Sequence, residues 1–173
     1  MEKGILLIAE DEIDLSEILV EMLTPYCAQI YTASNGKQAL EIYNKNPTID
    51  AILSDINMPI MTGFQFLARL RESGNTIPFV TLTAYGDQEN MRESMRLNAT
   101  DFLTKPFDRK ELTETITKLL KYGVQLKKNQ QNISSLFQDL NIPNEKINTI
   151  KKYYQSSNIL RVENSKYSQF NTK

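Results

Sequence analysis

Five short apolar runs alternate with amphipathic helical patterns over residues 1–121, and no other feature restricts the fold of this chain as strongly. The segments between the runs carry apolar residues three and four positions apart, as one face of a helix requires. Repeated units of this kind form a parallel sheet with right-handed crossovers and helices on both faces. We therefore predict a doubly wound five-stranded α/β domain, flavodoxin-like with strand order 2-1-3-4-5. The predicted strands are residues 5–9, 29–33, 51–55, 79–83 and 102–103.

The third run leads to a single carboxylate, Asp55. Successive apolar residues from Ala51 to Leu53 are typical of a strand that is buried on both faces of a sheet. Asp55 then lies at the end of this strand, and in open α/β sheets ligands bind beyond the carboxyl ends of the strands. An isolated aspartate at such a place is more often a turn or capping residue.

Polar residues also end the neighbouring strands: Glu10 and Asp11 follow the first, Thr83 ends the fourth and Lys105 follows the fifth. In the predicted strand order they meet Asp55 in one crevice. Carboxylates held this close repel one another unless a cation lies among them, and Mg²⁺ or Mn²⁺ prefers oxygen ligands. We interpret Asp55 as the acceptor of a phosphoryl group whose charge the metal, Lys105 and Thr83 stabilise. The alternative is that these charges only solvate the ends of loops.

Several classes of protein are excluded by what the sequence lacks. Without histidine, the chain has no Ser-His-Asp or Cys-His catalysis and no phosphohistidine of its own. No glycine-rich run precedes a Lys-Ser or Lys-Thr pair, so there is no P-loop. A haloacid-dehalogenase-type phosphatase would need an acid where Asn57 stands. Flavodoxin-like phosphate binding after the first strand is opposed by the acidic residues 10–12.

Residues 4–121 resemble the receiver domain of two-component response regulators and are similar to the single-domain chemotaxis regulator. The resemblance rests on the acidic residues 10–12, Asn35-Gly36, residues 55–59 followed by Gly63, Thr83-Ala84, and residues 99–107.

By that resemblance Asp55 is the phosphoacceptor, and Asp11 and Asp55 ligate Mg²⁺ directly. Glu10 would act through water, and the backbone carbonyl of Asn57 would complete the protein ligands. The resemblance implies phosphoryl transfer from a sensor histidine kinase or a phosphotransfer protein. The chain would then be a signalling switch that catalyses only its own phosphorylation and dephosphorylation.

The resemblance also implies how the switch works. Thr83 and Lys105 would hold the phosphoryl oxygens, and Lys105-Pro106 would be a cis peptide. Thr83 and Phe102 would be the switch residues. Output would pass to a protein partner on the face formed by the fourth helix, the fifth strand and the fifth helix.

Three positions depart from the family pattern, namely Glu10, Asn98 and Phe102. Glu10 stands where aspartate is commoner, and its longer side chain still reaches a metal-bound water. Asn98 replaces the usual glycine and is the next-best residue for a left-handed backbone. Phe102 replaces the switch tyrosine, so no hydroxyl is available there. Tyr85 either shields an acyl phosphate from water or simply packs.

The resemblance ends near residue 121, where the net charge of the chain changes from negative to positive. Residues 1–121 contain 12 Lys and Arg against 18 Asp and Glu, whereas residues 122–173 contain 8 against 3. We predict an acidic receiver domain over 1–121, a helical extension over 122–154 and a mobile tail over 155–173. The extension is either continuous with the fifth helix or separated from it by a stop near Gly123. The continuous helix would repeat at Leu112, Ile116, Leu119, Gly123, Leu126, Gln130, Ile133, Phe137 and Leu140.

The function of the extension is open. A continuous helix could pair with a second copy and give a phosphorylation-controlled homodimer. The other alternative is a DNA-binding transcriptional regulator, because lysines near Ile147 and Ile150 could contact nucleic acid. No helix-turn-helix pair can be made out in the sequence. The apolar runs are too short for a membrane span or a signal peptide, and Cys27 has no cysteine to pair with. We therefore expect a soluble cytoplasmic protein.

Overall fold

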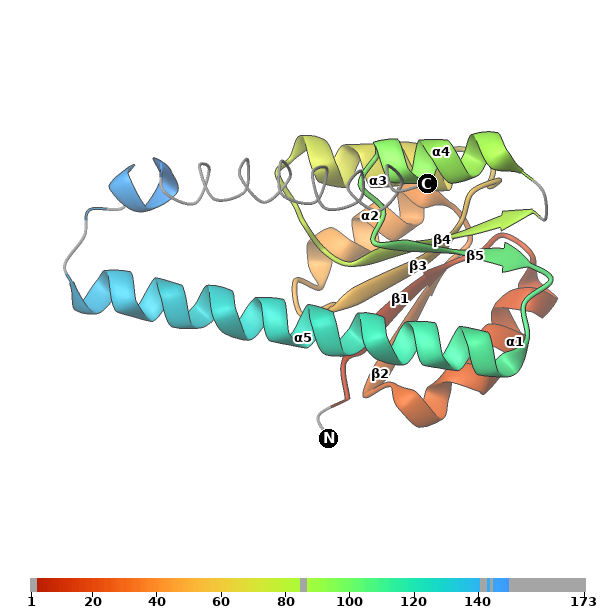
Figure 1. Cartoon of the computed structure of the whole chain (residues 1–173), viewed down its shortest axis with the longest axis horizontal. Coiled ribbons are helices and arrows are strands. Elements are labelled where there is room, and N and C mark those ends of the chain that lie inside the picture. Colours follow the sequence, from red (N-terminus) through yellow and green to blue (C-terminus); the bar gives the residue numbers. More distant parts are fainter. Residues whose placement is uncertain (1–2, 85–86, 141–142, 144, 150–173) are drawn as a thin grey trace, which may run out of the picture. The chain divides into compact units, whose positions relative to one another are not determined.

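A computed structural model describes residues 3–84, 87–140, 143 and 145–149, without the side chain of Phe137. The chain divides into two compact units, Met1–Lys128 and Asn129–Lys173. In the first unit, five parallel strands form one sheet with the order β2-β1-β3-β4-β5 (Figure 1). The predicted fold class and strand order are confirmed. The strands are β1 (Ile5–Ala9), β2 (Gln29–Ala33), β3 (Ala51–Asp55), β4 (Phe79–Ala84) and β5 (Asp101–Lys105).

The fifth strand is longer than predicted. The sequence pattern located it at residues 102–103 because only these two are apolar, but its polar ends also pair with β4. Thr104 lies opposite Thr83, and Lys105 lies opposite Ala84. This longer pairing carries Lys105 to the carboxyl edge of the sheet.

Helices cover both faces of the sheet (Figure 1). On one face, α1 and α5 pack against Leu6, Ile8 and Leu53, while the opposite face buries Leu7 and Ile52 against α2 and α3. This division follows from the alternation of side chains along each strand. None of the described helices combines the length and the apolar character needed to cross a membrane. The helices are α1 (Ile13–Leu23), the 3₁₀ turn η1 (Thr24–Tyr26), α2 (Gly36–Lys45), α3 (Gly63–Glu72), α4 (Gln88–Arg96) and α5 (Arg109–Asp139).

Asn98, between α4 and β5, has a φ of 56°, which agrees with the left-handed backbone expected there. Its carbonyl oxygen accepts hydrogen bonds from Nε and an Nη of Arg71 at 3.2 and 3.0 Å. The same guanidinium donates to the carbonyls of Asn75 and Ile77. Arg71 therefore ties the loop before β5 to the loop before β4.

Helix α5 runs through Gly123 without a break, so the structure has the continuous alternative and no stop at this glycine. Gly123 allows the helix backbone to lie directly on the start of β3, because a Cβ atom there would collide with the carbonyl oxygen of Asp50. One turn later, Lys127 Nζ lies 2.9 Å from Asp50 Oδ1 and donates to the Ile49 carbonyl at 2.6 Å. The other carboxylate oxygen of Asp50 accepts from the Ile5 amide at 2.7 Å. This contact fixes α5 on the sheet as far as Lys127.

The predicted extension over 122–154 includes the end of α5 and a helical turn at residues 145–149. Tyr85, residues 150–154 and the predicted tail at 155–173 lie outside the described residues.

We expect Gly123→Ala to destabilise the protein. In an unrestrained helix this change adds about 1 kcal/mol of stability, but here the new methyl group meets the Asp50 carbonyl and should cost roughly 1–3 kcal/mol. Chemical denaturation of the full chain measures the difference. Asn132→Ala, at an exposed position of the same helix, is the control and should be neutral or mildly stabilising. A stabilised Gly123→Ala protein would contradict the contact.

Candidate functional site

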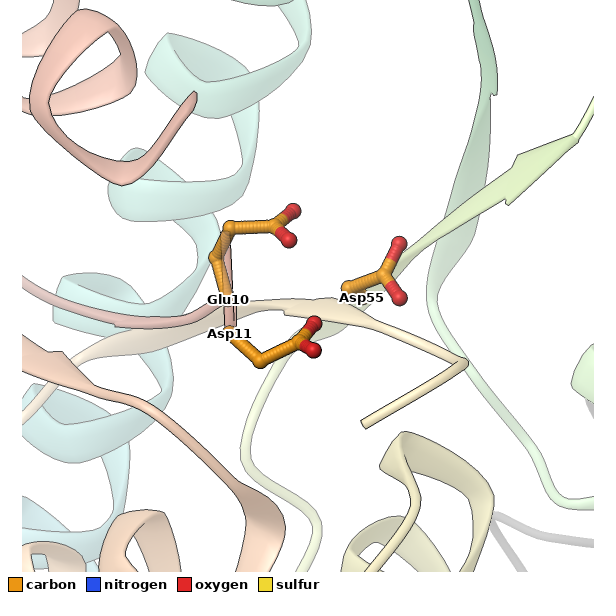
Figure 2. Close-up of side chains that lie close together, drawn as sticks. All are labelled: Glu10, Asp11 and Asp55. Atoms are coloured by element: carbon orange, nitrogen blue, oxygen red, sulfur yellow. The ribbon is translucent and has the colours of Figure 1, made fainter. Parts of the chain in front are cut away.

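Parallel strands bring three carboxylates together at the carboxyl edge of the sheet. Glu10 and Asp11 directly follow β1, and Asp55 is the last residue of β3, which pairs with β1. Figure 2 shows the three side chains pointing toward a common space. Each offers an oxygen, and these oxygens lie within 4.8 Å of one another. Glu10 and Asp55 are buried, whereas Asp11 is exposed.

Lys105 reaches this cluster from the end of β5. Its ammonium lies 2.6 Å from Asp55 Oδ1 and 3.0 Å from Glu10 Oε2, so it bridges the two buried carboxylates. The other Asp55 oxygen accepts a hydrogen bond from the Asn57 amide at 2.7 Å. Both oxygens of Asp55 are therefore held in defined positions by donors.

Burial and charge shape the electrostatics of the site. Burial raises the pKa of the Glu10 carboxyl, and the hydrogen bond from Lys105 offsets this only in part. For Lys105, burial alone would lower the pKa, but hydrogen bonds to Asp55 and Glu10 outweigh it and hold the pKa above its usual value. With Asp11, three carboxylates face one ammonium, which leaves two negative charges unbalanced when all are ionised.

The donor set fits a hard divalent cation. Three carboxylates supply only oxygen ligands, and the two unbalanced charges equal the charge of one Mg²⁺ or Mn²⁺ ion. Glu10, Asp11 and Asp55 would hold the ion. The metal role of the Asn57 backbone carbonyl stays a prediction. The contact of Asn57 with Asp55 is made by the backbone amide of Asn57.

Thr83 and Phe102 lie on the two strands beyond Asp55. Thr83 is buried, and its hydroxyl donates to the Leu103 carbonyl at a long 3.4 Å. Phe102 is half-buried on β5, opposite Thr81. Their switch roles stay predictions. The predicted cis peptide between Lys105 and Pro106 is present.

The path of the loop after β3 does not follow from the sequence pattern. Gly63 lies against the backbone of Asp55, because a Cβ atom at Gly63 would collide with the Asp55 carbonyl oxygen. The Gly63 backbone amide donates a hydrogen bond to the Ile56 carbonyl at 3.0 Å, so the loop folds tightly back over the end of β3. The apolar residue between Pro59 and Met61, Ile60, is exposed on this loop. In the sequence, an isoleucine within this otherwise turn-forming segment is the feature that marks it.

A family model described as the response regulator receiver domain matches residues 6–117. The chain belongs to this family. Receiver domains are phosphorylation switches of two-component systems, with an aspartyl phosphate and a Mg²⁺ ion at an acidic pocket. In this chain Glu10, Asp11 and Asp55 form an acidic cluster.

Individual relatives agree with the family. Sporulation initiation phosphotransferase F of Bacillus subtilis is 33% identical over 115 residues, which cover 66% of this chain and 92% of that protein. The structure of Vibrio cholerae chemotaxis protein CheY4 matches with a TM-score of 0.63 and 30% identity, over 69% of this chain and all of CheY4. The receiver domain of Saccharomyces cerevisiae Ssk1, solved with the histidine phosphotransfer protein Ypd1, matches with a TM-score of 0.63 and 25% identity, over 68% of this chain and 89% of that one.

Some relatives are longer than this receiver. The chain spans 62% and 54% of the lengths of two matched proteins named as transcriptional regulators. Residues 118–173 lie outside the family match.

Magnesium should stabilise the folded protein through this receiver's acidic cluster. At about 100 times its Kd, a ligand of the native state adds roughly 2.7 kcal/mol of stability, and MgCl₂ should therefore raise the Tm. Asp11→Asn removes an exposed member of the cluster and should reduce the shift. Calorimetry against KCl of equal ionic strength measures it. Glu12→Gln, an exposed neighbour outside the cluster, should keep the full shift, and an equal shift in Asp11→Asn would contradict the site.

Proposed function

We propose that this chain is a response regulator that accepts a phosphoryl group on Asp55 in a Mg²⁺-dependent reaction and thereby changes its contacts with protein partners. The observation that supports this proposal best is the short contact between Asp55 and Lys105. It lies within a cluster in which the carboxylates outnumber the ammonium group. A carboxylate oriented in this way is a nucleophile, and the surrounding charges suit the oxygens of an incoming phosphoryl group.

Transfer needs no base in this chain, because the Asp55 carboxylate is already ionised when it attacks. One carboxylate oxygen forms a bond to phosphorus, and the bond from phosphorus to the donor atom breaks with its electron pair leaving on the donor. The Asn57 amide holds the second oxygen of Asp55 during the attack. A bound Mg²⁺ would neutralise charge on the phosphoryl oxygens.

Lys105 and Thr83 are the groups that we expect to change partners. Lys105 now bridges Asp55 and Glu10, and its ammonium would move to a phosphoryl oxygen with little displacement. The 3.4 Å bond from Thr83 to Leu103 is long for a hydroxyl donor, so little is lost when the hydroxyl turns to the phosphoryl group. Phe102, on the strand beside Thr83, would repack with it.

The phosphohistidine donor lies outside these 173 residues, because they contain no histidine. A sensor histidine kinase or a phosphotransfer protein is the proposed donor, and the complex of Ssk1 with Ypd1 supports this choice. The proposed output surface is the face of α4, β5 and α5. A second copy is an alternative output partner, since the end of α5 exposes Ile133 and Leu136, and Leu140 just after the helix is exposed as well.

Acetyl phosphate with Mg²⁺ should add one phosphate to the protein, detected by intact mass spectrometry. Asp55→Asn should abolish the added mass, because the amide is no longer a nucleophile. Asp101→Asn, an exposed aspartate at the start of β5, is the matched control and should label like the natural chain. Labelling that persists in Asp55→Asn, or that fails in the natural chain, would contradict the proposed function.

A further inference from the structure

The turn Ser34-Asn35-Gly36, between β2 and α2, lies beside both loops that carry the acidic cluster. Just before this turn, the Ala33 carbonyl accepts a hydrogen bond from the Glu10 amide at 2.9 Å. At its end, the Gly36 amide donates to the Met61 carbonyl at 2.9 Å, in the loop that follows β3. Strand β1 separates β2 from β3 in the sheet. The turn therefore joins two loops that the sheet itself connects only through β1 and β3.

Gly36 has no room for a side chain. A Cβ atom there would lie 2.7 Å from the Met61 carbonyl oxygen and 3.0 Å from the Thr62 carbonyl oxygen. Both are backbone atoms, which cannot rotate away as the end of a side chain can. Glycine thus permits a close approach of two backbones. Any other residue at this position would push the loop after β3 away from the turn.

The loop after β3 contacts Asp55 at both of its ends. At its start, the Asn57 amide holds one carboxylate oxygen of Asp55 at 2.7 Å. At its end, Gly63 directly follows the residues that meet Gly36, and it lies against the Asp55 carbonyl. A displacement of this loop would therefore move the groups that orient the Asp55 carboxylate.

The conformation of Ile60 indicates that contacts hold this loop in place. Its φ is 68°, and the Met61 amide donates to the Pro59 carbonyl at 2.7 Å, which closes a three-residue turn. A β-branched residue avoids this region, and such strain persists only where the surroundings impose it. The bond from Gly36 to Met61 is one such constraint, and the buried side chain of Met58 is another.

The turn between β2 and α2 is itself fixed by a side chain of α2. Gln38 Oε1 accepts hydrogen bonds from the Ser34 amide at 2.8 Å and from the Ser34 hydroxyl at 3.0 Å. In return, Asn35 Oδ1 accepts from the Gln38 amide at 2.9 Å. Gln38 is exposed, so its side chain can be removed without opening the core.

We propose that this turn sets the affinity of the acidic cluster for Mg²⁺ by fixing the loops of Glu10 and Asp55 relative to each other. Gly36 has no side chain with which to contact the ion, so it is a positioning residue that acts through the loop backbone. The inference rests on the Mg²⁺ site of the proposed function. Groups that orient metal ligands change affinity by about 10-fold to 100-fold. Because the bound ion draws displaced ligands together, the loss falls on affinity and not on the maximal rate of phosphorylation.

Isothermal titration calorimetry of Gly36→Ala with MgCl₂ tests the proposal without any phosphoryl transfer. The Kd for Mg²⁺ should rise about 10-fold or more. Gly123→Ala is the matched control, because its methyl group also meets a backbone carbonyl but does so at the start of β3. Its Kd should equal that of the natural chain. In labelling with acetyl phosphate, the half-saturating Mg²⁺ concentration of Gly36→Ala should rise by the same factor, while the rate at saturating Mg²⁺ stays unchanged.

Gln38→Ala tests the same turn without a steric clash. It removes the acceptor that fixes Ser34 and should raise the Kd for Mg²⁺ by a smaller factor. Gln29→Ala, at an exposed position at the start of β2, is its control and should bind Mg²⁺ like the natural chain.

An unchanged Kd in Gly36→Ala, an equal rise in Gly123→Ala, or a lower maximal rate at an unchanged Kd would overturn the inference. Should Gly36→Ala fail to fold, an unchanged Kd in Gln38→Ala overturns it alone. A natural chain that binds Mg²⁺ but is not labelled by acetyl phosphate would overturn the proposed function and leave this inference in place. A natural chain that binds no Mg²⁺ would overturn both.

Discussion

The Lys105 ammonium, held between Asp55 and Glu10, is the interaction on which the rest of the site depends. Two buried carboxylates at adjacent strand ends would otherwise repel each other. Lys105 also draws the end of β5 toward β1 and β3, across the intervening strand β4. One ammonium balances only one of the three carboxylates, so the site remains suited to a divalent cation. The positive charge of that cation would in turn suit the negative charge of an approaching phosphoryl group.

Strand β4 contacts helix α4 through a pair of buried hydroxyl groups. Thr81 and Thr83 lie on the same face of β4, since side chains alternate along a strand. Ser94 is the one fully buried residue of α4, and its hydroxyl donates to the Asn90 carbonyl. The Thr81 hydroxyl must therefore donate to Ser94, 2.9 Å away. This buried hydroxyl pair therefore joins α4 to β4.

Much of the fold and of the candidate site could be predicted from the sequence, because both follow from local patterns. Apolar runs and helical spacing located the strands, and the shared carboxyl edge of parallel strands brought Glu10, Asp55 and Lys105 together. Gly123 could not be interpreted in this way. A glycine that ends a helix and one that permits close packing look alike until the position of the distant Asp50 carbonyl is known. The strain at Ile60 was equally hidden, because it depends on a backbone angle that contacts elsewhere in the loop impose.

In the proposed function, Asp55 carries the phosphoryl group as an acyl phosphate. Borohydride reduces an acyl phosphate of aspartate to homoserine and leaves a free carboxylate or a phosphate ester unchanged. Peptide mass spectrometry after treatment with acetyl phosphate, Mg²⁺ and then borohydride should find homoserine at position 55. Homoserine at another aspartate, or a borohydride-resistant phosphate on a serine, threonine or tyrosine, would contradict the account.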